Sequence, residues 1–224
     1  MEPGLDEYEY NILGKHFSLP LIDTSNHTKE CILLNATILF ATRGYASVSM
    51  RDLADITGIK PASLYNHFSS KEVLWKEALK HAKGLYLLYF DHLDGAIAKA
   101  RTFEEVLDVI FLEPKKMANL FTCYAFCMIQ SEQFRDSDAG DVFNETILKY
   151  SMEFMQKRFE QCIEKGMVEP FDTKTVARII MNSVLIGLGI TVQKCIGRTV
   201  DCEPSEMFAE LQQFILQAVK RPQV

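Results

Sequence analysis

Residues 49–68 read SMRDLADITGIKPASLYNHF, and this stretch decides the fold of the chain. It predicts two short helices joined by a sharp turn. Ser49 can cap the first helix, and Asp52 three residues later can complete a capping box. Gly58 ends that helix, because glycine adopts a left-handed backbone without a Cβ penalty. Pro61 suits the first position of the second helix, where the missing N–H costs nothing.

The second helix has one apolar side and one polar side. Leu64 and Phe68 are four residues apart and face inward. The outward positions are small, polar or aromatic: Ala62, Ser63, Tyr65, Asn66 and His67. Packing alone explains such a short helix with so polar an outer face poorly. We therefore predict a helix-turn-helix that inserts this helix into the DNA major groove.

The sequence on either side predicts helices only, so the fold class is all-α. A first helix from Thr28 to Arg43 carries an apolar stripe at helical spacing and is stopped by Gly44. Residues 1–27 show no clean period and form either an irregular arm on the body or a disordered tail. Further helices are predicted at 69–99 and at 102–112, the second broken by Pro114. An apolar segment at 115–134 and a loop at 135–141 follow. The last three predicted helices span 142–165, 173–196 and 204–220.

Composition limits how the protein binds its partners. The chain of 224 residues has a net charge of −6, so bulk charge does not hold it to nucleic acid. Residues 28–72 carry a net charge of +1, and phosphate binding there depends on placement rather than excess charge. Six cysteines and no secretory signal fit a reducing, cytoplasmic location. The most apolar window, 179–192, is too short for a membrane span.

Residues 28–74 resemble the tetracycline-repressor (TetR) family of transcription regulators. The resemblance rests on 39–45 (LFATRGY), 49–54 (SMRDLA), 57–59 (TGI), 63–68 (SLYNHF) and the Lys71-Glu72 pair. It implies a DNA-binding domain at 28–74 followed by a helical ligand-binding and dimerisation domain at 75–224, behind an arm at 1–27. It also implies a homodimer on a pseudo-palindromic operator in double-stranded DNA, acting as a repressor and not as an enzyme.

The resemblance also implies roles for individual residues. Pro61, Ala62, Ser63 and Asn66 would lie against base edges, with Lys60 at the helix entrance. Tyr65, His67 and Lys71 would contact phosphates, and Thr28 and Ser49 would present helix N-termini to phosphates. The reading helix contains no arginine, so few groups can make bidentate base contacts. Sequence preference then depends on Ser63, Asn66, Lys60 and DNA shape.

The resemblance implies that members of an aromatic and methionine-rich set in the body line a site for an apolar or amphipathic effector, although core packing is the favoured explanation of each residue taken alone. The candidate ligand-binding residues are Tyr86, Phe90, Phe111, Met117, Phe121, Tyr124, Met128, Phe154 and Met155, with Arg178 and Asn182 as polar contacts unless they lie at the surface or an interface. The helices across 173–220 are expected to form the dimer interface, intramolecular burial being the alternative.

No catalytic, phosphate-loop, cofactor or metal motif is present in the sequence. Cys123 and Cys127 share a helical face, and Cys195 and Cys202 flank a turn. Small core side chains explain these cysteines most simply. The alternative function is a redox sensor that uses these thiols on the same DNA-binding module.

Overall fold

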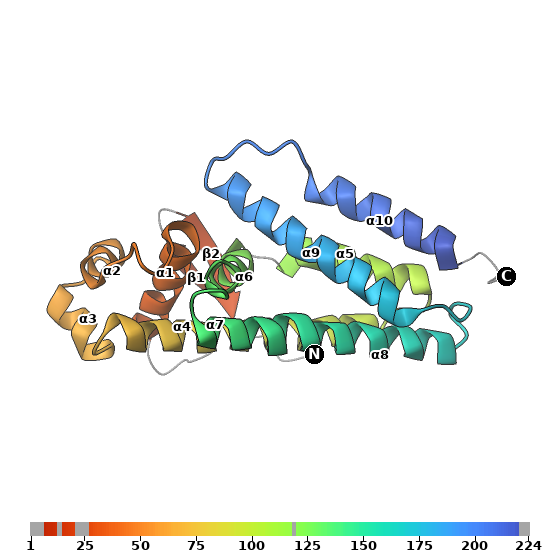
Figure 1. Cartoon of the computed structure of the whole chain (residues 1–224), viewed down its shortest axis with the longest axis horizontal. Coiled ribbons are helices and arrows are strands. Elements are labelled where there is room, and N and C mark those ends of the chain that lie inside the picture. Colours follow the sequence, from red (N-terminus) through yellow and green to blue (C-terminus); the bar gives the residue numbers. More distant parts are fainter. Residues whose placement is uncertain (1–6, 13–14, 21–26, 118–119, 220–224) are drawn as a thin grey trace. The chain divides into compact units, whose positions relative to one another are not determined.

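The computed structural model describes residues 7–12, 15–20, 27–117 and 120–219, and it confirms the all-α architecture (Figure 1). The chain divides into two compact units. The first contains Met1–Tyr86 and Asn119–Phe143, and the second contains Leu87–Ala118 and Asn144–Val224. The predicted helix-turn-helix lies wholly in the first unit.

Three helices of the first unit form the predicted helix-turn-helix. They are α1 (His27–Arg43), α2 (Met50–Thr57) and α3 (Pro61–His67). The long helix α4 (Lys71–Ile97) follows, and Ser70 caps its start by accepting the Val73 N–H at 3.2 Å. Phe40 of α1 and Trp75 of α4 meet edge to face at 5.3 Å and are almost fully buried. This aromatic contact fixes the start of α4 against α1.

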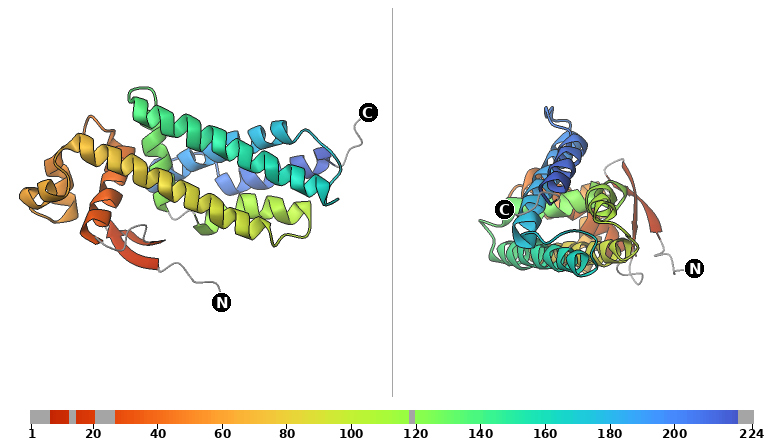
Figure 2. Two further views of the ribbon diagram at one scale, coloured as in Figure 1. Left: turned by 90° about the horizontal axis from the view of Figure 1, so that it is seen from below. Right: turned by 90° about the vertical axis from the view of Figure 1, so that its right-hand side faces the viewer.

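Two antiparallel strands lie before α1, and the sequence pattern did not predict these strands. β1 (Glu7–Ile12) pairs with β2 (Lys15–Pro20) in a register that places Glu7 opposite Pro20 and Ile12 opposite Lys15. Figure 2 shows the pair beside α1. Six-residue strands of mixed polar and apolar residues have too weak an alternation to be distinguished from a loop by pattern alone.

α6 (Leu120–Glu132) packs along α1 within the first unit. α7 begins at Ser137, whereas the sequence predicted a loop until 141. The reason is Asp136, whose carboxylate accepts a hydrogen bond from the Ala139 N–H at 2.8 Å and so caps the helix five residues earlier. α7 (Ser137–Val142) continues directly into a π-helical stretch, Phe143–Tyr150.

The second unit is built from α5 (Phe103–Met117), α8 (Ser151–Glu164), α9 (Thr173–Cys195) and α10 (Pro204–Val219). α9 packs on α8, and α10 lies along α9 and α5 (Figure 1). The predicted break at Pro114 is wrong: α5 continues to Met117, because a proline this close to a helix end removes only one hydrogen bond.

Gly187 allows α9 and α10 to approach closely. A Cβ atom at this position would lie 2.5 Å from Cζ of Phe208, whose ring stacks on Phe111 at 5.7 Å. Gly187 therefore serves a helix contact within the chain.

Candidate nucleic-acid interface

α3 exposes its polar side and buries its apolar side, as predicted. Leu64 is completely buried, while the Tyr65 side chain is 51 % exposed. Pro61 occupies the first turn after Lys60, whose extended backbone (φ −67°, ψ 143°) starts the helix. The outward residues Lys60, Pro61, Ala62, Ser63, Tyr65 and Asn66 are all exposed, and His67 is half-buried.

The turn before α3 depends on Gly58, which adopts φ 70° and donates its N–H back to the last turn of α2. An L-residue adopts this conformation only at a cost. The turn brings Ile59 partly inward and starts α3 two residues later. The short connection thus positions the exposed side of α3 relative to α2.

The start of α2 has the predicted capping box. The Asp52 N–H donates to Ser49 Oγ, and the Ser49 N–H donates to the Asp52 carboxylate at 2.7 Å. The Ser49 hydroxyl also donates to the Asp52 carboxylate. This bond, followed by the one from the Ser49 N–H, lowers the pKa of Asp52. The N–H groups of Met50 and Arg51 lie beyond the reach of any intrahelical carbonyl and remain available for a phosphate.

Arg51 is an exposed cation in this first turn that the sequence reasoning passed over. Its position in the sequence, beside the first N–H groups of a capped helix, could have identified Arg51 as a phosphate-binding candidate. A guanidinium at a helix start has no favourable interaction with the helix dipole, so a bound anion would give it a partner.

Lys71, expected to contact a phosphate, instead binds main-chain carbonyls. Its ammonium donates to the carbonyl oxygens of Tyr45 and Val48, both at 3.0 Å, and lies 4.2 Å from the Tyr45 ring centre. Two of its three N–H donors are thereby used inside the protein. The geometry makes Lys71 a positioning residue for the loop between α1 and α2.

Glu132 at the end of α6 holds the same loop from the other side. Its Oε1 accepts the Tyr45 N–H at 3.0 Å, and the residue is only 7 % exposed. The Tyr45 ring in turn contacts Trp75 at 5.0 Å and Phe40 at 5.6 Å. We call Lys71, Glu132 and Tyr45 the loop clamp.

A buried hydrogen bond joins α1 to α4. Nε2 of His81 lies 2.8 Å from Oε1 of Glu30, and both side chains are buried. Thr28, expected to meet a phosphate, is exposed at the start of α1 two residues before Glu30. Sequence patterns do not reveal this pair, because its partners are 51 residues apart.

The candidate ligand-binding residues are divided between the two units. Tyr86, Tyr124 and Met128 are buried in the first unit, and Phe90, Phe111 and Met155 are buried in the second. Phe90 packs edge to face on the half-buried Phe154 at 4.8 Å. The side chains of Met117 and Phe121 lie outside the described residues. Arg178 and Asn182 are exposed on α9.

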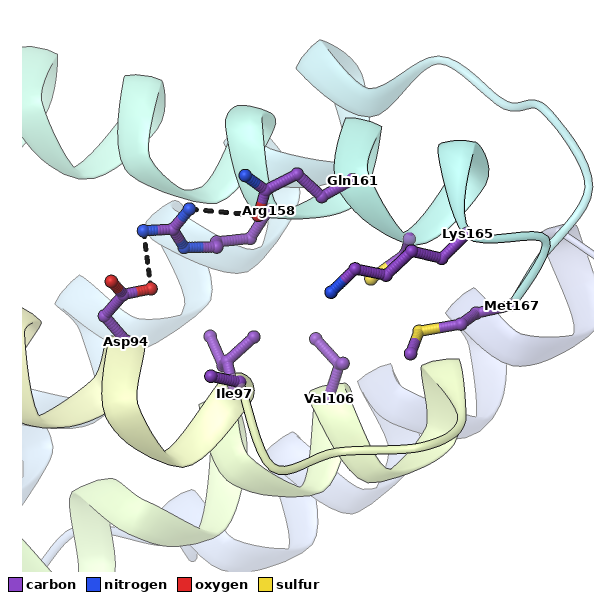
Figure 3. Close-up of a pocket in the computed structure, with 9 residues that line it drawn as sticks. Asp94, Ile97, Val106, Arg158, Gln161, Lys165 and Met167 are labelled. Atoms are coloured by element: carbon purple, nitrogen blue, oxygen red, sulfur yellow. Dashed lines mark hydrogen bonds and ion pairs between the residues drawn. The ribbon is translucent and has the colours of Figure 1, made fainter.

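A cavity of about 200 Å³ lies in the second unit and involves none of the predicted ligand-binding residues. It is lined by Asp94, Ile97, Ala98, Val106, Arg158, Gln161, Cys162, Lys165 and Met167 (Figure 3). Charged and apolar side chains thus share one small enclosure.

The cysteines with described side chains are free thiols. Burial raises the pKa of Cys127 to about 12, and Cys123 is buried beside it. Cys195 has no described side chain, so the alternative of a redox pair with Cys202 lies outside the described residues. Since the thiolate is the reactive form, the Cys123–Cys127 pair is a poor redox switch.

We therefore expect Cys127 in the folded protein to resist thiol reagents. At pH 8 only about one thiol in ten thousand would be ionised, given this pKa. Mass spectrometry after Ellman's reagent should find Cys127 unmodified, while denatured protein reacts fully. Peroxide should change the DNA affinity of the Cys123→Ser, Cys127→Ser double variant no differently from that of the parent protein. Rapid native labelling of Cys127 would contradict the burial argument.

Comparison with known proteins identifies the N-terminal region. The sequence model described as "Bacterial regulatory proteins, tetR family" matches residues 32–78. The transcriptional repressor KstR2 of Mycolicibacterium smegmatis is 33 % identical over 93 residues, which are 42 % of this chain and 39 % of that protein. The negative transcriptional regulator IcaR of Staphylococcus aureus is 36 % identical over 69 residues, 31 % of this chain and 33 % of that protein.

These sequence matches therefore span about two fifths or less of the curated relatives. The fold likeness extends much further. A transcriptional regulator from Saccharomonospora viridis, solved in complex with choline, superposes with a TM-score of 0.67 at 21 % identity and covers 86 % of this chain and 98 % of that one. Residues 32–78 therefore match the tetR family of bacterial regulatory proteins, and the structural likeness extends the shared fold over most of the chain.

Proposed function

We propose that this protein is a dimeric, DNA-binding transcription repressor that a small-molecule effector releases from its operator. The observation that carries the proposal is α3, which presents Ser63, Tyr65 and Asn66 to solvent while Leu64 anchors it. The match of residues 32–78 to the family's DNA-binding region supports it, as do the printed names of the relatives, which are repressors.

In this proposal α3 enters the major groove, and Ser63, Asn66 and Lys60 face base edges beside Pro61 and Ala62. Tyr65 and His67 contact phosphates on either side. The first turns of α1 and α2, at Thr28 and Ser49, accept further phosphates through their N–H groups, and Arg51 adds a charge there. Lys71 is assigned to the loop clamp, which holds α2 and α3 in the docking geometry.

Asn66→Ala tests direct base readout. An asparagine that pairs with an adenine edge contributes about 1–3 kcal/mol of discrimination, so affinity for a selected operator should fall about five- to 150-fold. Binding to a scrambled duplex should stay the same, because phosphate contacts remain. The operator would first be selected from random duplexes with the parent protein, and affinities measured by fluorescence anisotropy.

Lys80→Ala is the matched control, since Lys80 is an exposed side chain on α4 outside the proposed interface. It should bind both duplexes as the parent does. If the selection enriches no sequence, or if Asn66→Ala binds the enriched operator with parental affinity, α3 does not read DNA in this way.

Dimerisation is proposed through α9 and α10, as expected for 173–220. Ile186 on α9 is 58 % exposed and Phe214 on α10 is 59 % exposed. Ile179, one heptad before Ile186, lies on the same face of α9 and is also exposed. Large exposed apolar side chains on two helices that pack on each other favour an interaction surface, and a second copy is the occupant that a two-fold operator would need.

The part of α9 from Thr173 to Lys194 is 22 residues long and largely apolar. Only a third of its most apolar 18-residue segment is buried. The apolar window 179–192 is too short for a membrane span, but the helix that contains it is long enough by length and composition. Arg178 and Asn182 lie on the exposed part of α9 within this stretch, and charged groups are unfavourable in lipid. We therefore propose a protein partner for α9 and a cytoplasmic location.

The effector is proposed to bind the helical body. The structural relative in complex with choline supports a small-molecule ligand for this fold without fixing its chemistry here. The aromatic contact between Phe90 and Phe154 provides apolar surface in the second unit. Release from DNA requires that the effector prefer the non-binding conformation, since equal affinity for both would shift nothing.

A further inference from the structure

The cavity of the second unit is bounded by the ends of three helices. Asp94 and Ile97 belong to the last turn of α4, Val106 to the first turn of α5, and Arg158 and Gln161 to the end of α8. Lys165 follows α8 directly, and Figure 3 shows its side chain extending into the space above Ile97 and Val106. The cavity therefore has a polar side formed by Arg158, Gln161 and Lys165 with Asp94 of α4, and an apolar side formed by Ile97 and Val106.

The charges around the cavity favour an anion. Arg158 forms an ion pair with Asp94, while none of the described acidic side chains pairs with Lys165. One positive charge thus remains without a counterion. The ends of α4 and α8 add partial negative charges of about half a unit each, and the start of α5 adds a similar positive one, so a positive balance is left.

Arg158 also offers an unused donor. Its guanidinium donates from Nη1 to the Gln161 side-chain oxygen at 3.0 Å and from Nη2 to Asp94, and it packs over the Phe154 ring. Its Nε is buried without an acceptor among the described residues. The side chain is only 15 % exposed and is held at three points, so the unused N–H has a fixed direction. A buried donor without a partner is unfavourable, and a bound acceptor would correct this.

The size and the apolar side restrict the ligand. The volume of about 200 Å³ corresponds to about seven water molecules at liquid density, hence to about seven non-hydrogen atoms. Ile97 and Val106 are buried, and Met167 closes the far side beside Lys165 (Figure 3). Such walls accept a short alkyl chain but offer it no hydrogen bond.

We propose that this cavity binds a short-chain monocarboxylate, with its carboxylate near Lys165 and Arg158 Nε and its alkyl chain on Ile97, Val106 and Met167. The site is distinct from the aromatic residues proposed for the effector, and its occupancy does not depend on DNA binding. A single negative charge matches the single unpaired cation. A phosphate carries more than one negative charge at neutral pH and would also leave the apolar walls without a partner.

Isothermal titration calorimetry on the full-length protein with sodium pentanoate tests the proposal. We expect one site per chain. Pentanamide, which has the same shape without the charge, should bind at least tenfold more weakly, and so should inorganic phosphate, which has no alkyl chain. Lys165→Gln should weaken pentanoate binding at least tenfold, and Lys165→Arg should restore most of it. Lys157→Gln, an exposed lysine of α8 outside the cavity, should bind as the parent does.

Three results would overturn the proposal. The first is no binding of pentanoate at millimolar concentration. The second is parental affinity in Lys165→Gln, which would place the ligand elsewhere. The third is equal binding of pentanamide or phosphate, which would exclude a monocarboxylate-selective site. Each measurement uses protein without DNA, so failure here leaves the proposed repressor function untouched, and failure of operator binding leaves this site untouched.

Discussion

Replacing the exposed apolar residues of α9 and α10 by aspartate, as Ile186→Asp with Phe214→Asp, is expected to produce a monomer that binds a two-half-site operator at least about a hundredfold more weakly. Burying either carboxylate against an apolar partner surface carries a large desolvation penalty. Coupled half-sites gain a factor of about 10² to 10⁴ from effective concentration, which a monomer loses. Light scattering would give the mass, and anisotropy the affinity.

The same variant should bind an isolated half-site as the parent protein does, because both substitutions lie in the second unit and leave α3 intact. Lys157→Asp is the matched control: it changes the net charge by the same amount on an exposed position of α8. It should remain dimeric. A double variant that stays dimeric, or a dimer loss without weaker operator binding, would contradict the proposed role of α9 and α10.

Lys71→Met is expected to lower the free energy of unfolding by about 3 kcal/mol, since two hydrogen bonds from a charged donor contribute about 1.5–3 kcal/mol each and part of the packing is kept. The acceptors at risk are the Tyr45 and Val48 carbonyls. Urea denaturation followed by circular dichroism would measure the change. Lys80→Met, an exposed lysine on the same helix, should change stability by less than about 0.5 kcal/mol.

The salt dependence of DNA binding separates the two roles considered for Lys71. A phosphate contact contributes about 0.9 to the slope of log affinity against log salt concentration, and its loss would reduce the slope by that amount. A positioning residue leaves the slope unchanged while affinity falls. If Lys71→Met left the free energy of unfolding unchanged but reduced the salt slope of DNA binding, Lys71 would be a phosphate contact, and the loop clamp would be wrong.

The parts of the fold that were predictable from sequence depend on neighbours along the chain. The capping box of Ser49 and Asp52 joins residues three apart, and Gly58 and Pro61 act through their own backbone preferences. These local rules were sufficient to define α2, the turn and α3. They also predicted which side of α3 would be exposed, because Leu64 repeats at helical spacing with Phe68.

The parts that could not be predicted depend on contacts between distant residues or on main-chain atoms. Glu132 accepts from Tyr45, 87 residues away, and Lys71 donates to carbonyls that every residue type carries. A lysine beside a reading helix therefore suggests a phosphate contact, whatever its actual partner. The charged cavity was missed for the same reason, since Asp94 and Arg158 meet only in the folded second unit.

The loop clamp has a consequence for how the chain can vary. Its polar contacts engage the N–H of Tyr45 and the carbonyls of Tyr45 and Val48, while the side chains of Ala46 and Ser47 are exposed. Almost any residue can therefore occupy 46 and 47 without disturbing how α2 is held. Proline could not replace Tyr45, because proline has no N–H to donate to Glu132. Descendants of this protein are free to diversify the loop's outer surface while its backbone path stays the same.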